Sequence, residues 1–152
     1  MPKKPTAADA QLILQLYDLR REAEMRKARS WFAGSFFPET ADDYAKVANA
    51  YSIPENAWLR QVVSYWGMAA ACVLNGALNE DLFFETCGEM WFTLSKVSPI
   101  LKDVRAKMQT PELFAHMEKL ATKSKAGKER LKKLEARMAA MRKSMVGTTR
   151  DS

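Results

Sequence analysis

The segment PENAWLRQVVSYWGMAAACVL, about residues 54–74, is the most apolar part of this 152-residue chain. Its proline suits the first turn of a helix, where the missing N–H costs nothing. Asn75-Gly76 closes the segment, because glycine tolerates the left-handed conformation that commonly ends helices. Apolar side chains, Trp66 among them, cover most of its circumference. A helix that is apolar on nearly all sides is buried on nearly all sides, so we expect it to form the centre of the core.

Helical spacing recurs on both sides of this segment, and no run of strict alternation indicates a strand. Caps such as Thr6 and Asn79, and the pairs Ser98-Pro99 and Thr110-Pro111, mark where helices begin. The predicted helices span about 6–32, 40–51, 54–74, 79–94, 99–108 and 111–121. The apolar stripe expected for the first of them consists of Leu12, Leu16, Leu19 and Ala23. The sequence therefore predicts an all-α protein, a compact bundle of about six helices.

The C-terminal third differs from the rest in charge. The chain has 24 Lys and Arg against 18 Asp and Glu, a net charge of +6. Residues 102–152 hold 14 of the basic and six of the acidic side chains, a net of +8, which leaves a net of −2 for residues 1–101. The polar run Lys123–Lys128, with one glycine, indicates a hinge. We expect a bundle domain over residues 1–122 and an appended basic amphipathic helix with a tail over residues 123–152.

This last helix carries apolar residues at spacings of three and four, which is a heptad seam. They are Leu131, Leu134, Met138, Met141 and Met145. The stripe can pack on the chain's own bundle while the lysines face water, or it can pair with a second copy of the chain. Alternatively, the basic residues contact the phosphates of nucleic acid or an anionic membrane surface. The basic residues for such anion contact are Lys123, Lys125, Lys128, Arg130, Lys132, Lys133, Arg137, Arg142 and Lys143. No aromatic residue lies within the stripe, which argues against base stacking.

Cysteine usage and hydropathy bear on the compartment. Cys72 and Cys87 both lie in apolar helical patterns, so we expect two buried, reduced thiols in a reducing compartment. No apolar run follows Lys3 and Lys4 as in a secretion signal. The longest weakly polar stretch, residues 62–74, is shorter than the roughly 20 residues that span a bilayer. The sequence predicts a cytoplasmic protein without a transmembrane segment.

No set of residues indicates an active site. His116 is the single histidine and has no partners at ligand spacing, and no glycine-rich phosphate loop occurs. Asp81, Glu85 and Glu89 recur at spacings of four, but no Glu-x-x-His pair for metal binding accompanies them. This pattern favours an acidic, solvated helix face. Such a face can also dock onto the chain's own basic helices. The sequence therefore predicts a non-enzymatic protein with no catalytic, cofactor-binding or metal-binding residues and no small-molecule substrate.

One part of the chain resembles a known family. The run from Ser64 to Phe83 places an aromatic-rich helix, a glycine turn and an acidic, aromatic helix in succession. Trp91, Ser98-Pro99-Ile100 and Arg105 follow in the order seen in a bacterial all-helical family of unknown function. The similarity covers about residues 58–120 and implies a compact helical domain without an assigned activity.

We therefore expect an interaction or scaffold protein with a protein partner or a second copy of itself, which self-associates through the C-terminal Leu/Met stripe. The alternative hypothesis is sequence-nonspecific nucleic-acid binding through the basic residues of the last helix.

Overall fold

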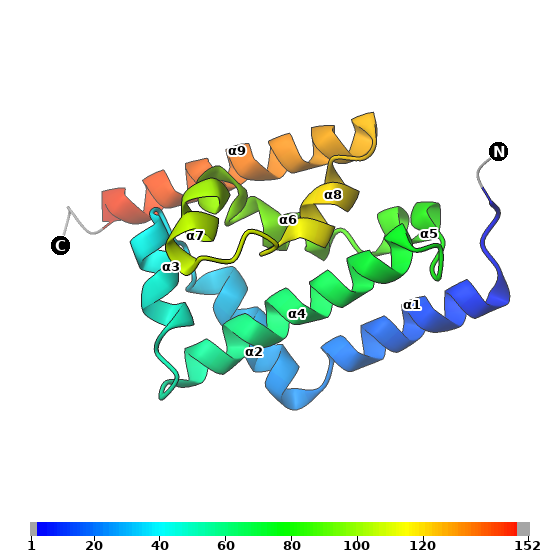
Figure 1. Cartoon of the computed structure of the whole chain (residues 1–152), viewed down its shortest axis with the longest axis horizontal. Helices are drawn as coiled ribbons and strands as arrows, with labels where there is room; N and C mark the ends of the chain where they lie inside the picture. The colour runs from blue at the N-terminus through cyan, green and yellow to red at the C-terminus, as the bar shows by residue number, and fades with distance from the viewer. Residues whose placement is uncertain (1–2, 149–152) are drawn as a thin grey trace.

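The computed structural model describes residues 3–148, which fold into α-helices joined by short connections (Figure 1). The helices are α1 (Ala7–Arg20), α2 (Ala23–Gly34), α3 (Ala41–Ala48), α4 (Pro54–Leu74), α5 (Glu80–Thr86), α6 (Glu89–Ser95), α7 (Leu101–Met108), α8 (Ala115–Ala121) and α9 (Lys125–Thr148), with a 3-10 turn at Ser98–Ile100. The all-α class is confirmed. The expected number of bundle helices, about six, is too low, because two of the predicted segments are each divided in two.

The first division separates α1 from α2 at Arg21 and Glu22. The Glu22 carboxylate accepts a hydrogen bond from the Met25 amide at 2.9 Å and so caps the new helix. The predicted stripe on α1 was wrong, because Leu12 and Leu19 are 40% and 52% exposed. The buried face instead contains Ile13 and Arg20, whose guanidinium lies 5.1 Å from the centre of the Trp66 ring. A cation that stacks on an aromatic ring can occupy a core position, which an apolar pattern does not reveal.

The second division separates α5 from α6 at Cys87 and Gly88. The predicted helix over 111–121 also begins later than expected, at Ala115. The preceding residue, Phe114, has a left-handed backbone with a φ of 62°. Its buried ring packs edge-on against Tyr44 at a centroid distance of 6.3 Å, and this contact holds the strained residue in place.

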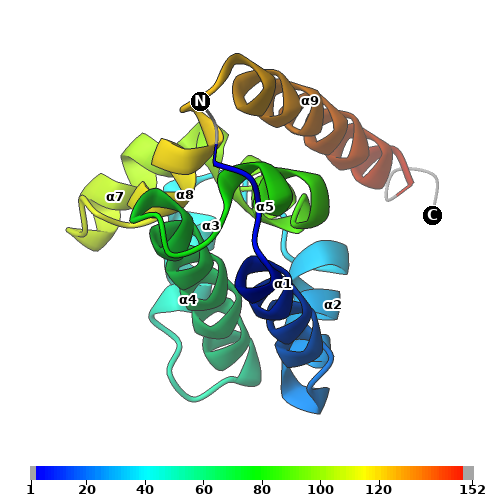
Figure 2. The same ribbon diagram turned by 90° about the vertical axis from the view of Figure 1, so that its right-hand side faces the viewer.

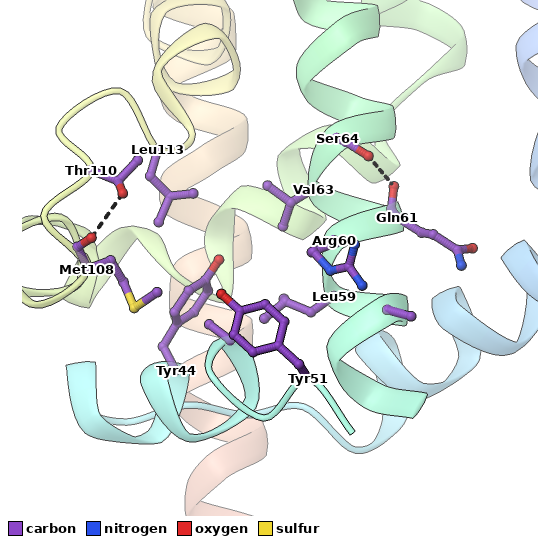
Figure 3. Close-up of a pocket in the computed structure, with 12 residues that line it drawn as sticks. Tyr44, Tyr51, Leu59, Arg60, Gln61, Val63, Ser64, Met108, Thr110 and Leu113 are labelled. Atoms are coloured by element: carbon purple, nitrogen blue, oxygen red, sulfur yellow. Dashed lines mark hydrogen bonds between the residues drawn. The ribbon is translucent and has the colours of Figure 1, made fainter. Parts of the chain in front are cut away.

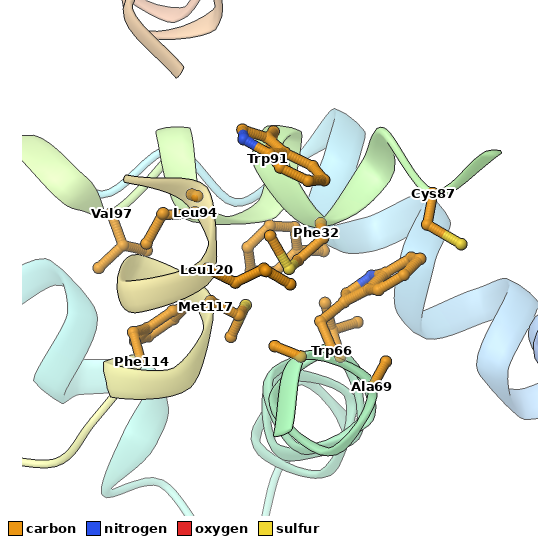
Figure 4. Packing of buried hydrophobic residues seen from close by; sticks show 14 of the residues in the cluster. Phe32, Trp66, Ala69, Cys87, Trp91, Leu94, Val97, Phe114, Met117 and Leu120 are labelled. Atoms are coloured by element: carbon orange, nitrogen blue, oxygen red, sulfur yellow. The ribbon is translucent and has the colours of Figure 1, made fainter. Parts of the chain in front are cut away.

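The helix α4 packs against α2, α3 and α8 (Figures 1 and 2). Its Trp66 is fully buried in the core that Figure 4 shows, together with Phe32 of α2 and Met117 of α8. The helix is not buried on all sides, however. Its exposed face consists of Arg60, Ser64, Met68 and Cys72 at spacings of four. The prediction of two buried thiols was therefore wrong for Cys72, while Cys87 is buried.

The last helix, α9, crosses the bundle on the side of α6 and α8 (Figure 1). Its first turn is capped by Ser124, whose hydroxyl accepts a hydrogen bond from the Gly127 amide at 3.0 Å. The predicted hinge over Lys123–Lys128 was therefore too long, because the helix already begins at Lys125. No helix within residues 3–148 combines the length and the apolar character that a membrane span requires.

Candidate functional site: the basic C-terminal helix

The inner face of α9 contributes to the core of the chain. Leu131 and Met138 are buried and Leu134 is half-buried, whereas Met141 and Met145 are 38% and 48% exposed. Leu131 belongs to the same buried cluster as Trp91 of α6 and Leu120 of α8. The first half of the predicted self-association stripe is thus covered by the chain itself, and the surface that remains lies at the C-terminal end of α9.

Gly127 lets the start of α9 approach α8 closely. A side-chain Cβ at this position would overlap the carbonyl oxygen of Ala121, which is the last residue of α8. The polar residues around this glycine predict a hinge, because glycine commonly interrupts helices. Its role in the structure is close backbone packing inside a helix.

Two of the predicted anion-binding arginines bind the protein itself. Arg130 donates a hydrogen bond to the Phe84 carbonyl at 2.6 Å, and its guanidinium lies 3.6 Å from the centre of the Phe84 ring. Arg142, further along α9, donates to the carbonyl oxygens of Lys96 at 2.9 Å and Pro38 at 3.3 Å. These arginines attach α9 to α5, to the end of α6 and to the segment before α3, so neither points freely to solvent.

One of the carbonyl groups that Arg142 binds belongs to Lys96, a fully buried lysine that no sequence pattern marks. Its Nζ donates hydrogen bonds to the carbonyl oxygens of Phe32 and Ala33, in the last turn of α2, and lies 3.7 Å from the centre of the Phe37 ring. The negative end of the α2 dipole and the ring face both favour the ammonium. Burial, with a smaller contribution from Arg142, nevertheless lowers the pKa of Lys96 to about 7.

The outer face of α9 carries the remaining predicted cations. Those that are exposed are Lys125, Lys128, Lys132, Lys133, Arg137 and Lys143. Within residues 3–148 none of these six forms an ion pair, whereas Lys123 pairs with Glu80 of α5. Because α9 contains eight basic and two acidic residues, its net charge of +6 equals that of the whole chain. The excess positive charge of the chain is therefore matched by that of α9, and six of its eight basic residues are exposed.

The three acidic residues Asp81, Glu85 and Glu89 do not lie on one continuous helix. The break at Gly88 places Asp81 and Glu85 on α5 and Glu89 on α6. Both carboxylate oxygens of Glu89 accept hydrogen bonds from Arg29, each at 2.7 Å. This two-point ion pair joins α6 to α2 and raises the pKa of Arg29. Throughout residues 3–148 no group of three or more His, Cys, Asp and Glu side chains is arranged to hold a metal ion.

Comparison with known proteins places this chain in a family. The model of a domain of unknown function, DUF4760, matches residues 5–124. The chain belongs to this family. The resemblance seen over residues 58–120 thus extends to nearly the whole bundle. The DUF4760 match includes α1 to α8 and ends immediately before α9, which begins at Lys125. Searches of curated proteins and of solved structures find no match to this chain.

Proposed function

We propose that this protein is a non-enzymatic helical module that binds the phosphate backbone of nucleic acid through the outer face of α9. The observation that carries the proposal is the set of six exposed cations on one helix, none of which is neutralised by an ion pair within residues 3–148. Phosphate contacts of this kind supply affinity and orientation, but they do not read the base sequence.

The way in which α9 is held supports this function. Arg130 and Arg142 each donate hydrogen bonds to carbonyl oxygens of the bundle. Leu131 and Met138 are buried beneath the helix. A helix attached at several points along its length presents its lysines in a fixed arrangement, so binding loses little conformational entropy of the backbone.

The first testable prediction is a steep dependence of affinity on salt. Fluorescence anisotropy with a labelled DNA duplex is expected to give a slope of log K against log salt of about −4.5 if five phosphates are neutralised. The triple variant Lys125→Gln, Lys128→Gln, Lys132→Gln is expected to weaken binding and to make the slope shallower by up to about three.

The control for this prediction carries the same change in net charge elsewhere. Lys4→Gln, Lys27→Gln, Lys46→Gln alters three exposed lysines outside α9 and is expected to retain most of the affinity. A duplex of unrelated sequence should bind equally well. Equal weakening by both triple variants would assign the attraction to net charge, and no binding at low salt would rule out the proposed function.

Contact with another protein is a second candidate function, because α1 exposes several large apolar side chains. They are Leu12, Leu14, Tyr17 and Leu19. Exposed apolar surface of this kind commonly marks interaction sites. Self-association through the C-terminal stripe stays a prediction, and Met141 and Met145 are the members still exposed.

Sedimentation velocity separates the two candidate self-association surfaces. A dimer that is lost in Leu14→Lys, Leu19→Lys but retained in Met141→Lys, Met145→Lys would assign the contact to α1. The opposite result would assign it to the C-terminal stripe. A wild-type protein that stays monomeric at all concentrations would contradict self-association through either surface.

A further inference from the structure

A pocket of about 620 Å³ lies between α3, α4, α7 and the turn that follows α7 (Figure 3). Its wall is largely apolar and includes Leu59, Val63 and Leu113. Pockets that bind small molecules typically enclose roughly 300–1,000 Å³ and combine an apolar wall with a few polar groups. The pocket therefore has the size and the lining of a site for a small organic ligand.

The first polar group of the pocket is the hydroxyl of Tyr44. The side chain is 3% exposed, and its hydroxyl points into the pocket in Figure 3. Within residues 3–148 this hydroxyl forms no hydrogen bond, and its oxygen is not among the enclosed side-chain atoms that lack a partner, so it is open to the pocket. Burial raises the pKa of Tyr44, so the group remains a hydrogen-bond donor at neutral pH. The ring of Tyr44 is thus held in the core, while its hydroxyl is available to donate to an acceptor on a ligand.

The second polar group is the guanidinium of Arg60, which is positioned by Asn56. Asn56 is fully buried, and its amide donates hydrogen bonds to the carbonyl oxygens of Val47 at 3.0 Å and Ala48 at 2.9 Å. The Asn56 side-chain oxygen accepts a hydrogen bond from the Arg60 Nε at 3.0 Å. One nitrogen of Arg60 is thereby fixed to the end of α3. Within residues 3–148, its two terminal nitrogens donate no hydrogen bond and pair with no carboxylate.

We propose that this pocket binds a small amphipathic carboxylic acid. The apolar body packs between Leu59, Val63 and Leu113, and the carboxylate accepts hydrogen bonds from the free terminal nitrogens of Arg60. The Tyr44 hydroxyl donates to an oxygen of the same ligand. Arg60 is the single charged residue of the lining, which matches the single charge of a carboxylate better than the double charge of a phosphate monoester.

The test compares three probes on the 152-residue chain by amide-detected NMR titration. Octanoate carries both the apolar body and the charge, octan-1-ol carries only the body, and acetate carries only the charge. Octanoate is expected to bind at least about tenfold more tightly than either control, because a hydrogen bond to a charged group contributes about 1.5–3 kcal/mol. The shifted amides should lie near Tyr44, Leu59–Ser64 and Leu113.

Single substitutions then test whether Arg60 and Tyr44 each contact the ligand. Arg60→Gln is expected to weaken octanoate binding by about tenfold or more and to leave octan-1-ol binding unchanged. Tyr44→Phe keeps the buried ring and should weaken octanoate binding by about threefold. Arg26→Gln, at an exposed position of α2 outside the pocket, is the matched control and should have no effect. Equal binding of octanoate and octan-1-ol by the wild-type protein, octanoate binding unchanged in Arg60→Gln, or shifts away from the pocket would overturn the proposal.

Discussion

At the level of single residues, Lys96 is unusual because it is a basic side chain in the core. It is fully buried, it donates hydrogen bonds to the last turn of α2, and its neighbour Arg142 is also a cation. A lysine at such a position would be assigned to the surface from the sequence, because lysines are rarely buried without a partner. Its partners are backbone carbonyls and aromatic ring faces, and neither forms a pattern with Lys96 along the chain.

Lys96 is expected to make stability depend on pH. Its pKa is about 7 in the folded protein and close to 10.5 in the unfolded chain, so the unfolded state binds more protons between these values. The free energy of unfolding should therefore rise as pH increases from 7 towards 10, by on the order of 1 kcal/mol per pH unit at most.

Urea unfolding at pH 7, 8 and 9 measures this contribution. Lys96→Met should lose the Lys96 part of the slope, while Lys102→Met, at an exposed position, should keep it. If the free energy of unfolding changed with pH by the same amount in the wild type and in Lys96→Met, Lys96 would be protonated to the same extent in the folded and the unfolded state. That result would contradict the prediction.

At the scale of helices, the attachment of α9 depends on close approach at Gly127. Gly127→Ala is expected to lower the free energy of unfolding by about 1–3 kcal/mol, because the new methyl group overlaps the Ala121 carbonyl oxygen. A glycine-to-alanine substitution inside a helix usually raises the free energy of unfolding instead, since alanine is more favourable than glycine in a helix by about 1 kcal/mol.

The matched control is Gly147→Ala in the same helix. No atom lies within 4 Å of a Cβ built at Gly147, so this substitution should be neutral or slightly stabilising. Thermal unfolding followed by circular dichroism compares the two variants. If Gly127→Ala were as stable as Gly147→Ala, α9 would not pack against α8 as described.

The sequence predicts where a helix begins and ends only when local signals such as proline or glycine mark the position. The bounds of α4 were predicted to the residue, because Pro54 and Asn75-Gly76 are strong local signals. The break between α1 and α2 was missed, because its cap is a glutamate and no glycine or proline marks it. The buried face of α1 was predicted wrongly as well. Arg20 lies on that face because it contacts Trp66, a residue far from it in the chain.

At the scale of the whole molecule, the all-α class and the concentration of charge near the C-terminus were predictable from composition and periodicity. The distribution of the cations around α9 was not. Arg130 and Arg142 resemble their exposed neighbours in sequence, yet they bind carbonyl groups of the bundle. The pocket beside Arg60 was missed for a similar reason, because α3, α4 and α7 contribute to it from separate parts of the chain.

The proposed function requires that α9 packs on the bundle through Leu131 and Met138 and contacts phosphates with its outer face. An amide-detected NMR titration of the full chain with a DNA duplex at low salt tests it most directly. We expect shifts concentrated at the exposed residues of α9, such as Lys125, Lys128 and Lys132, and we expect these shifts to disappear as salt is raised. Shifts confined to α1 or to the pocket beside Arg60, or no shifts at all, would contradict it.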